Sequence, residues 1–229
     1  MTPTPFYDEG GITIYHGDCR EILPHLKPAG RPDLLILDPP FTEWEHVEHV
    51  DARTVLAFTS WQHRHHAEAL YGRPRTEVVW HFLDGRWVSH HLPITTHATI
   101  LVWGELNEVY VGEEQDQTPR KIAAHSHMPR MVSPRTQYVP RPRKALTSVL
   151  IHPHNPTGQP LGRWSKPVPV VRQLVEWAAM GPYLLDPFMG AGTSLRVAKD
   201  LGMRAVGIDL EERHCQLAVE RLAQEVLTI

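Results

Sequence analysis

Two short stretches of the chain carry residue types from which a binding site could be built. In the first, an apolar run at 183–185 leads into Asp186-Pro-Phe-Met-Gly-Ala-Gly-Thr-Ser194. The glycines Gly190 and Gly192 let the backbone turn tightly and approach a ligand that a side chain would block. Asp209 lies about twenty residues beyond the first glycine, where a carboxylate can accept hydrogen bonds from both hydroxyls of a ribose. The stretch predicts a nucleoside-binding βαβ unit.

The residues around the two glycines narrow the type of ligand. A glycine-rich turn alone is typical of many α/β proteins, so Gly190 and Gly192 do not identify a ligand by themselves. Position 195 is leucine, where dinucleotide-binding proteins place a third glycine, and no lysine follows the glycines as in a phosphate-binding P-loop. The expected ligand is therefore a nucleoside without a pyrophosphate.

The second stretch, Asp38-Pro39-Pro40-Phe41, follows an apolar run at 34–37. Two prolines remove two amide donors, so the Asp38 carboxylate and the Pro39 carbonyl can act together as acceptors only. The exocyclic amino group of a nucleobase carries two N–H donors and fits such a pair. Phe41 offers a face for base stacking, an interaction of about 1–3 kcal/mol. Equally, the tetrapeptide could be a strand-ending turn with a capping Asp and a core Phe.

Strand and helix signals alternate along the chain and predict an α/β sheet with a late antiparallel portion. Periodicity and turn residues predict strands at 12–15, 34–37, 54–59, 77–82, 99–102, 108–111, 183–185 and 204–209, with the strand at 108–111 a partner for 99–102. They predict helices at 20–26, 62–71, 167–179, 193–201 and 211–224.

Length and composition fit one sizeable core. The 229 residues are 41% hydrophobic and 21% charged, which is typical of a soluble globular protein. No apolar run approaches the length of a membrane span, and the Met-Thr-Pro-Thr-Pro start is unlike a signal peptide. The two cysteines, Cys19 and Cys215, cannot build a disulfide framework, so we expect a reducing cytoplasm.

The middle of the chain is basic although the net charge is −3. The segment 118–166 contains no Asp or Glu and is rich in proline. Such a segment contributes little to a core and is expected to face a polyanion, although a solvated loop would have the same composition. The basic residues expected to contact this polyanion are Arg120, Lys121, Arg130, Arg135, Arg141, Arg143 and Lys144.

Together, Asp38-Pro-Pro-Phe41 and Asp186-Pro-Phe-Met-Gly-Ala-Gly-Thr193 resemble the motifs of the S-adenosylmethionine-dependent amino-group DNA methyltransferases. The catalytic motif precedes the cofactor loop, which resembles the permuted β-class order. Further matches are His16-Gly17-Asp18, Ser165-Lys166-Pro167 and Gly207-Ile208-Asp209. The resemblance implies one Rossmann-like domain with a mostly parallel, doubly wound sheet. Its parts would be a catalytic part at 12–112, a basic target-recognition-like insertion at 113–165 and a cofactor-binding part at 166–229.

The resemblance also implies roles for individual residues. Asp38, Pro39, Pro40 and Phe41 would be catalytic, gripping the amino group of a base flipped out of duplex DNA. The cofactor S-adenosylmethionine would contact Gly17, Asp18, Lys166, Asp186, Phe188, Gly190, Gly192, Thr193, Ser194 and Asp209. Asp18 would accept from its adenine amino group, Asp209 would bind its ribose, and Lys166, Thr193 and Ser194 would lie near its carboxylate.

The resemblance leaves the substrate partly open. Aspartate at position 38 favours adenine N6 over cytosine N4, and RNA or a protein amide remain alternatives, as does a silent DNA-binding module on the same fold. Phe41 replaces the more usual tyrosine, which the family tolerates. The short middle segment implies a homodimer or a short target site. A restriction-modification role fits the family, but the sequence does not identify a partner or a target.

Other chemically reactive residues are expected to have structural or surface roles. His63, His65 and His66 have no carboxylate or cysteine close by in the sequence. We therefore expect these histidines to be exposed or hydrogen-bonded within the protein, and we expect no metal site. Cys19 and Cys215 lack the Pro-Cys context of cytosine-C5 methyltransferases and are expected to be packing residues. Trp44 and Trp61 could belong to the core or border the base pocket.

Overall fold

The computed structural model describes residues 3–26, 30–86, 95–106, 146, 148–153 and 165–224. Its strands are β1 (Tyr7–Glu9), β2 (Ile12–His16), β3 (Leu34–Leu37), β4 (Thr54–Thr59), β5 (Thr76–Arg86), β6 (Thr95–Gly104), β7 (Val149–Ile151), β8 (Tyr183–Asp186) and β9 (Arg204–Asp209). Its helices are α1 (Cys19–Leu26), the 3₁₀ helix η2 (Phe41–His46), α2 (Arg64–Tyr71), α3 (Val168–Ala178), α4 (Thr193–Asp200) and α5 (Glu212–Ala223).

The nine strands form one mixed sheet in the order β1-β2-β9-β8-β3-β4-β6-β5-β7. The five strands β2, β9, β8, β3 and β4 are successively parallel. Strand β6 runs antiparallel to both of its neighbours, β4 and β5, and β1 runs antiparallel to β2 at the edge. The predicted mostly parallel sheet with an antiparallel portion is therefore confirmed.

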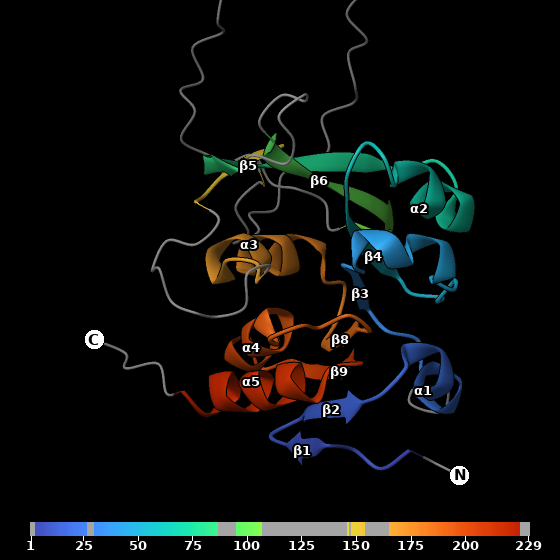
Figure 1. Cartoon of the computed structure of the whole chain (residues 1–229), viewed down its shortest axis with the longest axis vertical. Coiled ribbons are helices and arrows are strands. Elements are labelled where there is room, and N and C mark those ends of the chain that lie inside the picture. Colours follow the sequence, from blue (N-terminus) through green and yellow to red (C-terminus); the bar gives the residue numbers. More distant parts are fainter. Residues whose placement is uncertain are drawn as a thin grey trace, which may run out of the picture.

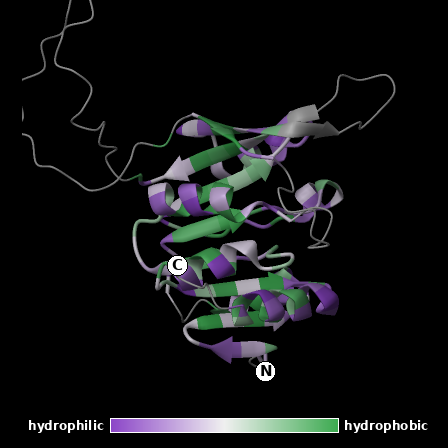
Figure 2. Ribbon diagram, turned by 90° about the vertical axis from the view of Figure 1, so that its left-hand side faces the viewer, coloured by the Kyte–Doolittle hydropathy of each residue, from purple (hydrophilic) through white to green (hydrophobic). Residues whose placement is uncertain are grey.

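Helices cover both faces of the sheet, which explains why its central strands are apolar throughout. Figure 1 shows α3, α4 and α5 on one side of the strands and α1 and α2 on the other. In β3, Leu34 and Ile36 pack in the cluster that includes α3, α4 and α5, whereas Leu35 and Leu37 pack with Trp44 and Ala67 on the opposite face. Apolar residues concentrate in these strands, while the short edge strand β1 is hydrophilic (Figure 2).

The structure differs from the sequence prediction at the edges of the sheet. Strands β1 and β7 were not predicted, because three-residue edge strands with exposed positions carry little periodicity. The predicted strand at 108–111 lies outside the described residues. Its expected partner, β6, is paired on one edge with β4 and on the other with β5, so the predicted pairing of 99–102 with 108–111 is wrong. No helix in the described ranges is long and apolar enough to cross a membrane.

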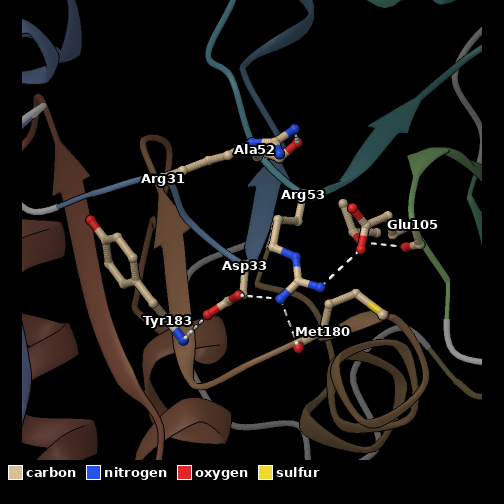
Figure 3. A network of polar contacts seen from close by, with 8 residues as sticks. Arg31, Asp33, Ala52, Arg53, Glu105, Met180 and Tyr183 are labelled. Atoms are coloured by element: carbon tan, nitrogen blue, oxygen red, sulfur yellow. Dashed lines mark hydrogen bonds and ion pairs between the residues drawn. The ribbon is translucent and has the colours of Figure 1, made fainter.

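A polar network fixes the loops that precede β3, β4 and β8 (Figure 3). The Arg53 guanidinium donates to Asp33 Oδ1 at 3.1 Å, to the Met180 carbonyl at 3.2 Å and to Glu105 Oε2 at 2.9 Å. Asp33 also accepts from the Tyr183 amide at 3.1 Å. The network lies at the amino ends of the parallel strands, so it sets the strand positions without occupying the carboxyl ends, where α/β sheets bind ligands.

Candidate functional site

The strand order reverses between β8 and β3, and this point organises the candidate site. From β8 the chain continues through α4 to β9, on one side, whereas from β3 it continues to β4, on the other. In open α/β sheets, ligands bind in the crevice outside the carboxyl ends of the strands at such a point. Asp186 ends β8 and Asp38 directly follows β3. Two carboxylates therefore meet where the topology predicts a ligand.

Asp38 forms an ion pair with Lys166, whose ammonium group contacts Asp38 Oδ2. Lys166 Nζ also lies 5.1 Å from the centre of the Phe58 ring. Burial raises the pKa of Asp38 above its usual value, although the positive charge of Lys166 opposes this rise. Lys166 therefore favours the ionised carboxylate in a site that would otherwise favour its protonated form.

The rest of the Asp38-Pro39-Pro40-Phe41 turn presents acceptors and an aromatic ring. Pro39 is buried, and no donor in the described part of the chain bonds its carbonyl or the Oδ1 atom of Asp38. Pro40 precedes the 3₁₀ helix η2, and its carbonyl accepts from the Glu43 amide at 2.9 Å. Phe41 is 57% exposed, so it is not the core residue that the alternative interpretation required.

Lys166 connects the two motifs, which are about 150 residues apart in the sequence. Its ammonium group contacts Asp38, and its backbone carbonyl accepts from Thr193 Oγ1 at 3.1 Å. Thr193 begins α4 directly after the glycine turn. The fold therefore brings the Asp38 turn and the glycine turn to the same edge of the sheet.

The two glycines of the turn have different surroundings. Gly190 has a φ of 53°, and its amide donates to Asp209 Oδ2 at 2.9 Å. A Cβ atom at Gly190 would meet nothing within 4 Å, so this glycine borders open space. Gly192 has a φ of 71°, but a Cβ atom there would lie 2.6 Å from Ala218 Cβ in α5. Gly192 thus permits close packing of α5 against the turn, the kind of role that the third glycine has in dinucleotide-binding proteins.

The hydroxyl groups that follow the glycines hold the site together. Ser194 Oγ donates to Asp186 Oδ2, and Thr193 Oγ1 is bonded by the guanidinium of Arg221. Thr193 and Ser194 were predicted to offer hydroxyls or amides to a cofactor carboxylate, and the structure bonds both hydroxyls to protein groups. The N-terminus of α4 has no side-chain cap, so its first backbone amides are not bonded by a capping side chain.

Asp186 is 4% exposed, and burial raises its pKa to about 7 despite hydrogen bonds from Ser194 and the Phe188 amide. The pKa of Asp186 is therefore higher in the folded protein than in the unfolded chain, where it is near 4. Such a group stabilises the fold at pH values below 4, and this contribution is lost as the pH rises through 7. The free energy of unfolding of the wild type should therefore fall by about 2–3 kcal/mol between pH 5 and pH 8. We predict that Asp186→Asn does not show this fall.

Urea denaturation of both proteins at the two pH values measures this effect. The asparagine can still accept from the Phe188 amide, so the two proteins differ mainly in charge. The wild type should lose stability relative to Asp186→Asn as the pH rises. Parallel pH profiles would show that Asp186 titrates normally.

The carboxyl ends of β9 and β2 extend the row of acidic groups. Asp209 Oδ1 accepts from the Glu211 amide at 2.9 Å and lies 3.0 Å from His214 Nδ1. The Gly17 amide donates to the Asp209 carbonyl at 2.9 Å. Asp18 is paired with Arg20, and this hydrogen bond lowers the pKa of Asp18. Gly17 and Asp18 follow β2, and Asp209 ends β9, the strand next to β8 and its Asp186. Asp18 carries a cationic partner that was not predicted.

Arg221 is a site-supporting residue that the sequence analysis did not identify. It is 5% exposed, and its guanidinium bonds Thr193 Oγ1 and, at 3.1 Å, Ser165 Oγ. Burial lowers the pKa of Arg221. The signal was present, because Arg221 interrupts the apolar stripe of the last helix. A charged residue on a buried face usually has a specific partner.

The surroundings of the remaining candidate residues differ from one another. Phe188 is partly buried and packs against the core on the η2 face. Trp44 is a core residue at 1% exposure, whereas Trp61 is 80% exposed. The proposed DNA-binding residues Arg120, Lys121, Arg130, Arg135, Arg141, Arg143 and Lys144 all lie outside the described residues. In the described ranges, no three His, Cys, Asp or Glu side chains gather as metal ligands.

Solved structures share this fold at low sequence identity. M1.HpyAVI superposes with a TM-score of 0.61 at 18% identity, over 93% of this chain and 100% of that one. PvuII DNA methyltransferase, described as cytosine-N4-specific, superposes with a TM-score of 0.64 at 12% identity, over 99% of this chain and 91% of that one. The Rossmann-like methyltransferase fold implied by the motifs is therefore confirmed.

Sequence comparisons match shorter segments. Type II methyltransferase M2.DpnII of Streptococcus pneumoniae is 51% identical over 45 residues, which is 20% of this chain and 17% of that protein. M2.LlaDCHI of Lactococcus lactis subsp. cremoris is 50% identical over 40 residues, 18% of this chain and 15% of that protein. The match thus spans less than a fifth of the length of each relative. The model of the DNA methylase family matches residues 96–220, more than half of this chain. Motifs, fold and family match agree, and the protein belongs to the amino-group DNA methylase family.

Proposed function

We propose that the protein transfers a methyl group from S-adenosylmethionine, the cofactor of this family, to the N6 amino group of adenine in DNA. The observation that carries this proposal is the junction at Lys166, which contacts Asp38 through its side chain and Thr193 through its carbonyl. The acceptors suited to an amino group thereby lie beside the glycine turn suited to a nucleoside.

The residues around the glycine turn fit S-adenosylmethionine. Open space beside Gly190 leaves room for a ligand close to the backbone. The uncapped start of α4 suits a carboxylate, and the buried Asp186 suits a cationic group when ionised. Asp209 lies on the next strand, fixed by the Gly190 amide, where it can accept from ribose hydroxyls. When bound, S-adenosylmethionine supplies an electrophilic methyl carbon.

The Asp38 turn acts on the amino group that receives the methyl. The nitrogen of a base amino group is a poor nucleophile because its lone pair is delocalised into the ring. Asp38 Oδ1 and the Pro39 carbonyl would accept hydrogen bonds from its two N–H groups and favour the pyramidal geometry that returns the lone pair to nitrogen. Lys166 on the other carboxylate oxygen favours the ionised form of Asp38 and opposes the rise in its pKa that burial causes. The protein contributes positioning and preorganised dipoles, which are effective in a partly buried site.

The target base must leave the duplex to reach this site. Base pairing hides the amino group, and flipping costs a few kcal/mol. Phe41, which is 57% exposed beside Asp38, offers a ring on which the flipped base would stack. Stacking of about 1–3 kcal/mol offsets part of that cost.

Cytosine N4 is the second candidate, because it presents the same amino group to Asp38 and Pro39. An RNA or protein amide substrate, or a silent module that only binds DNA, are further alternatives. The decisive experiment incubates the protein with labelled S-adenosylmethionine and unmethylated DNA, then digests the DNA to nucleosides. N6-methyladenine supports the proposal, and N4-methylcytosine replaces it with the second candidate. Cofactor binding without transfer to DNA would overturn it.

We further propose that the basic segment contacts the DNA backbone and that two copies act together as a homodimer. Arg141→Gln with Arg143→Gln should lower the slope of log affinity against log salt by about two, because two phosphate contacts are lost. Filter binding between 50 and 200 mM salt measures this slope, with Arg73→Gln with Arg75→Gln as the charge-matched control. An unchanged slope would contradict contact by these two residues.

The proposed homodimer is tested separately, by measuring the molar mass of the protein in solution by light scattering.

A further inference from the structure

Among the described residues, Phe41 is covered by one aromatic neighbour, His63, although more than half of its surface is exposed. The two rings are almost parallel, with an interplanar angle of 7° and a centroid distance of 5.4 Å. This is an offset stack of the kind that aromatic pairs favour. A planar ring stacked on one side can bind a second planar group only on its other side. The stack therefore decides which face of Phe41 is available.

His63 is held at a fixed position between the end of β4 and the start of α2. Its amide donates to the Ser60 carbonyl at 3.1 Å, and its own carbonyl accepts from the His66 amide at 3.1 Å. The His66 ring also stacks with the His63 ring, at 6.1 Å and 23°. Backbone bonds and ring packing thus fix His63, whereas Phe41 stands at the exposed start of η2.

Hydrogen bonding by the imidazole does not explain the orientation of the His63 ring. Its Nδ1 atom is buried and has no hydrogen-bond partner in the described part of the chain. The histidine cluster around it gathers no carboxylate or cysteine that would make a metal site among those residues. The contact that connects His63 to the candidate active site is its stack on Phe41.

We propose that His63 is a positioning residue for methyl transfer, which holds the Phe41 ring in the plane that receives the target base. This inference rests on the proposed function. Exposed side chains exchange rotamers on the ps–ns timescale, so an unsupported Phe41 would spend much of its time in other orientations. His63 restricts that motion before the base arrives, which reduces the ordering needed during the reaction.

Three variants separate stacking from other effects. His63→Leu keeps apolar bulk but removes the planar ring, and should lower the single-turnover rate of methyl transfer about three- to tenfold, the usual value of an aromatic pair. His63→Phe restores a ring and should recover most of that rate. His65→Leu is the matched control, because the His65 ring contacts His66 and is exposed. The DNA carries the site mapped for the wild type, and the cofactor is saturating.

A double-mutant cycle tests whether His63 acts through Phe41. In a Phe41→Leu background, His63→Leu should cause no further loss, since the ring it positions is gone. The cofactor dissociation constant and thermal midpoint should stay near the wild-type values in the single variants. A wild-type rate for His63→Leu, no recovery in His63→Phe, or additive losses in the cycle would overturn the inference. If the wild type itself transfers no methyl to DNA, the proposed function fails instead.

Discussion

Asp38→Ala is expected to lower the rate of methyl transfer by about 10²–10³-fold, the cost of removing one preorganised group that stabilises a transition state. The loss follows from the geometry, because Asp38 provides the carboxylate acceptor at the switch point. Single-turnover assays with labelled S-adenosylmethionine measure the rate, and calorimetry measures the cofactor dissociation constant. That constant should change little, since the glycine turn and Asp186 are untouched.

Two controls make this prediction specific. Glu43→Ala removes an exposed carboxylate from the same turn of chain and should leave the rate unchanged. Lys166→Met removes the positive charge that opposes the raised pKa of Asp38, so that pKa should rise further. Methyl transfer by this variant should therefore reach its full rate only at a higher pH than in the wild type. A weaker cofactor affinity with an unchanged rate in Asp38→Ala would instead assign this carboxylate to the cofactor site.

Gly192→Ala is expected to destabilise the fold by about 2–5 kcal/mol. The left-handed backbone at φ 71° costs an alanine about 1–2 kcal/mol. The new methyl group would also lie 2.6 Å from Ala218 Cβ, and overpacking of this kind costs about 1–3 kcal/mol. The thermal midpoint, measured by calorimetry, should fall by about 4–20 °C.

The neighbouring glycine provides the matched control. Gly190 has a similar positive φ but borders open space, so Gly190→Ala should cost only the backbone strain. Its methyl group would, however, enter the space proposed for the cofactor and weaken cofactor binding about tenfold or more. Ala218→Gly should partly restore the stability of Gly192→Ala. If both alanine variants were equally stable, close packing at Gly192 would not be the reason for that glycine.

Most elements of the fold could be predicted because their signals are local. Apolar runs such as 34–37 and 54–59 match β3 and β4, and Gly202 ends the helix predicted to begin at Thr193. The strands β1 and β7 were not recognised because each is short and partly exposed. Their pairing partners, rather than their own residues, define them.

The candidate site shows the same division between local motifs and long-range contacts. The motif at 38–41 indicated a pair of acceptors, and its position after a strand follows from the apolar run before it. The partner of Asp38 could not be predicted, because Lys166 lies 128 residues away. The stack of His63 on Phe41 likewise joins the ends of two neighbouring strands.

The sequence by itself determined the strand–helix alternation, the two motifs and the family to which they belong. Only the tertiary structure decided that Gly192 packs against α5, that Ser194 and Thr193 bond protein groups, and that Arg221 supports the turn. The physical reason is that a motif specifies residue types and backbone shape within a few residues. Burial, ion pairing and steric contact depend on which distant segments the sheet order brings together.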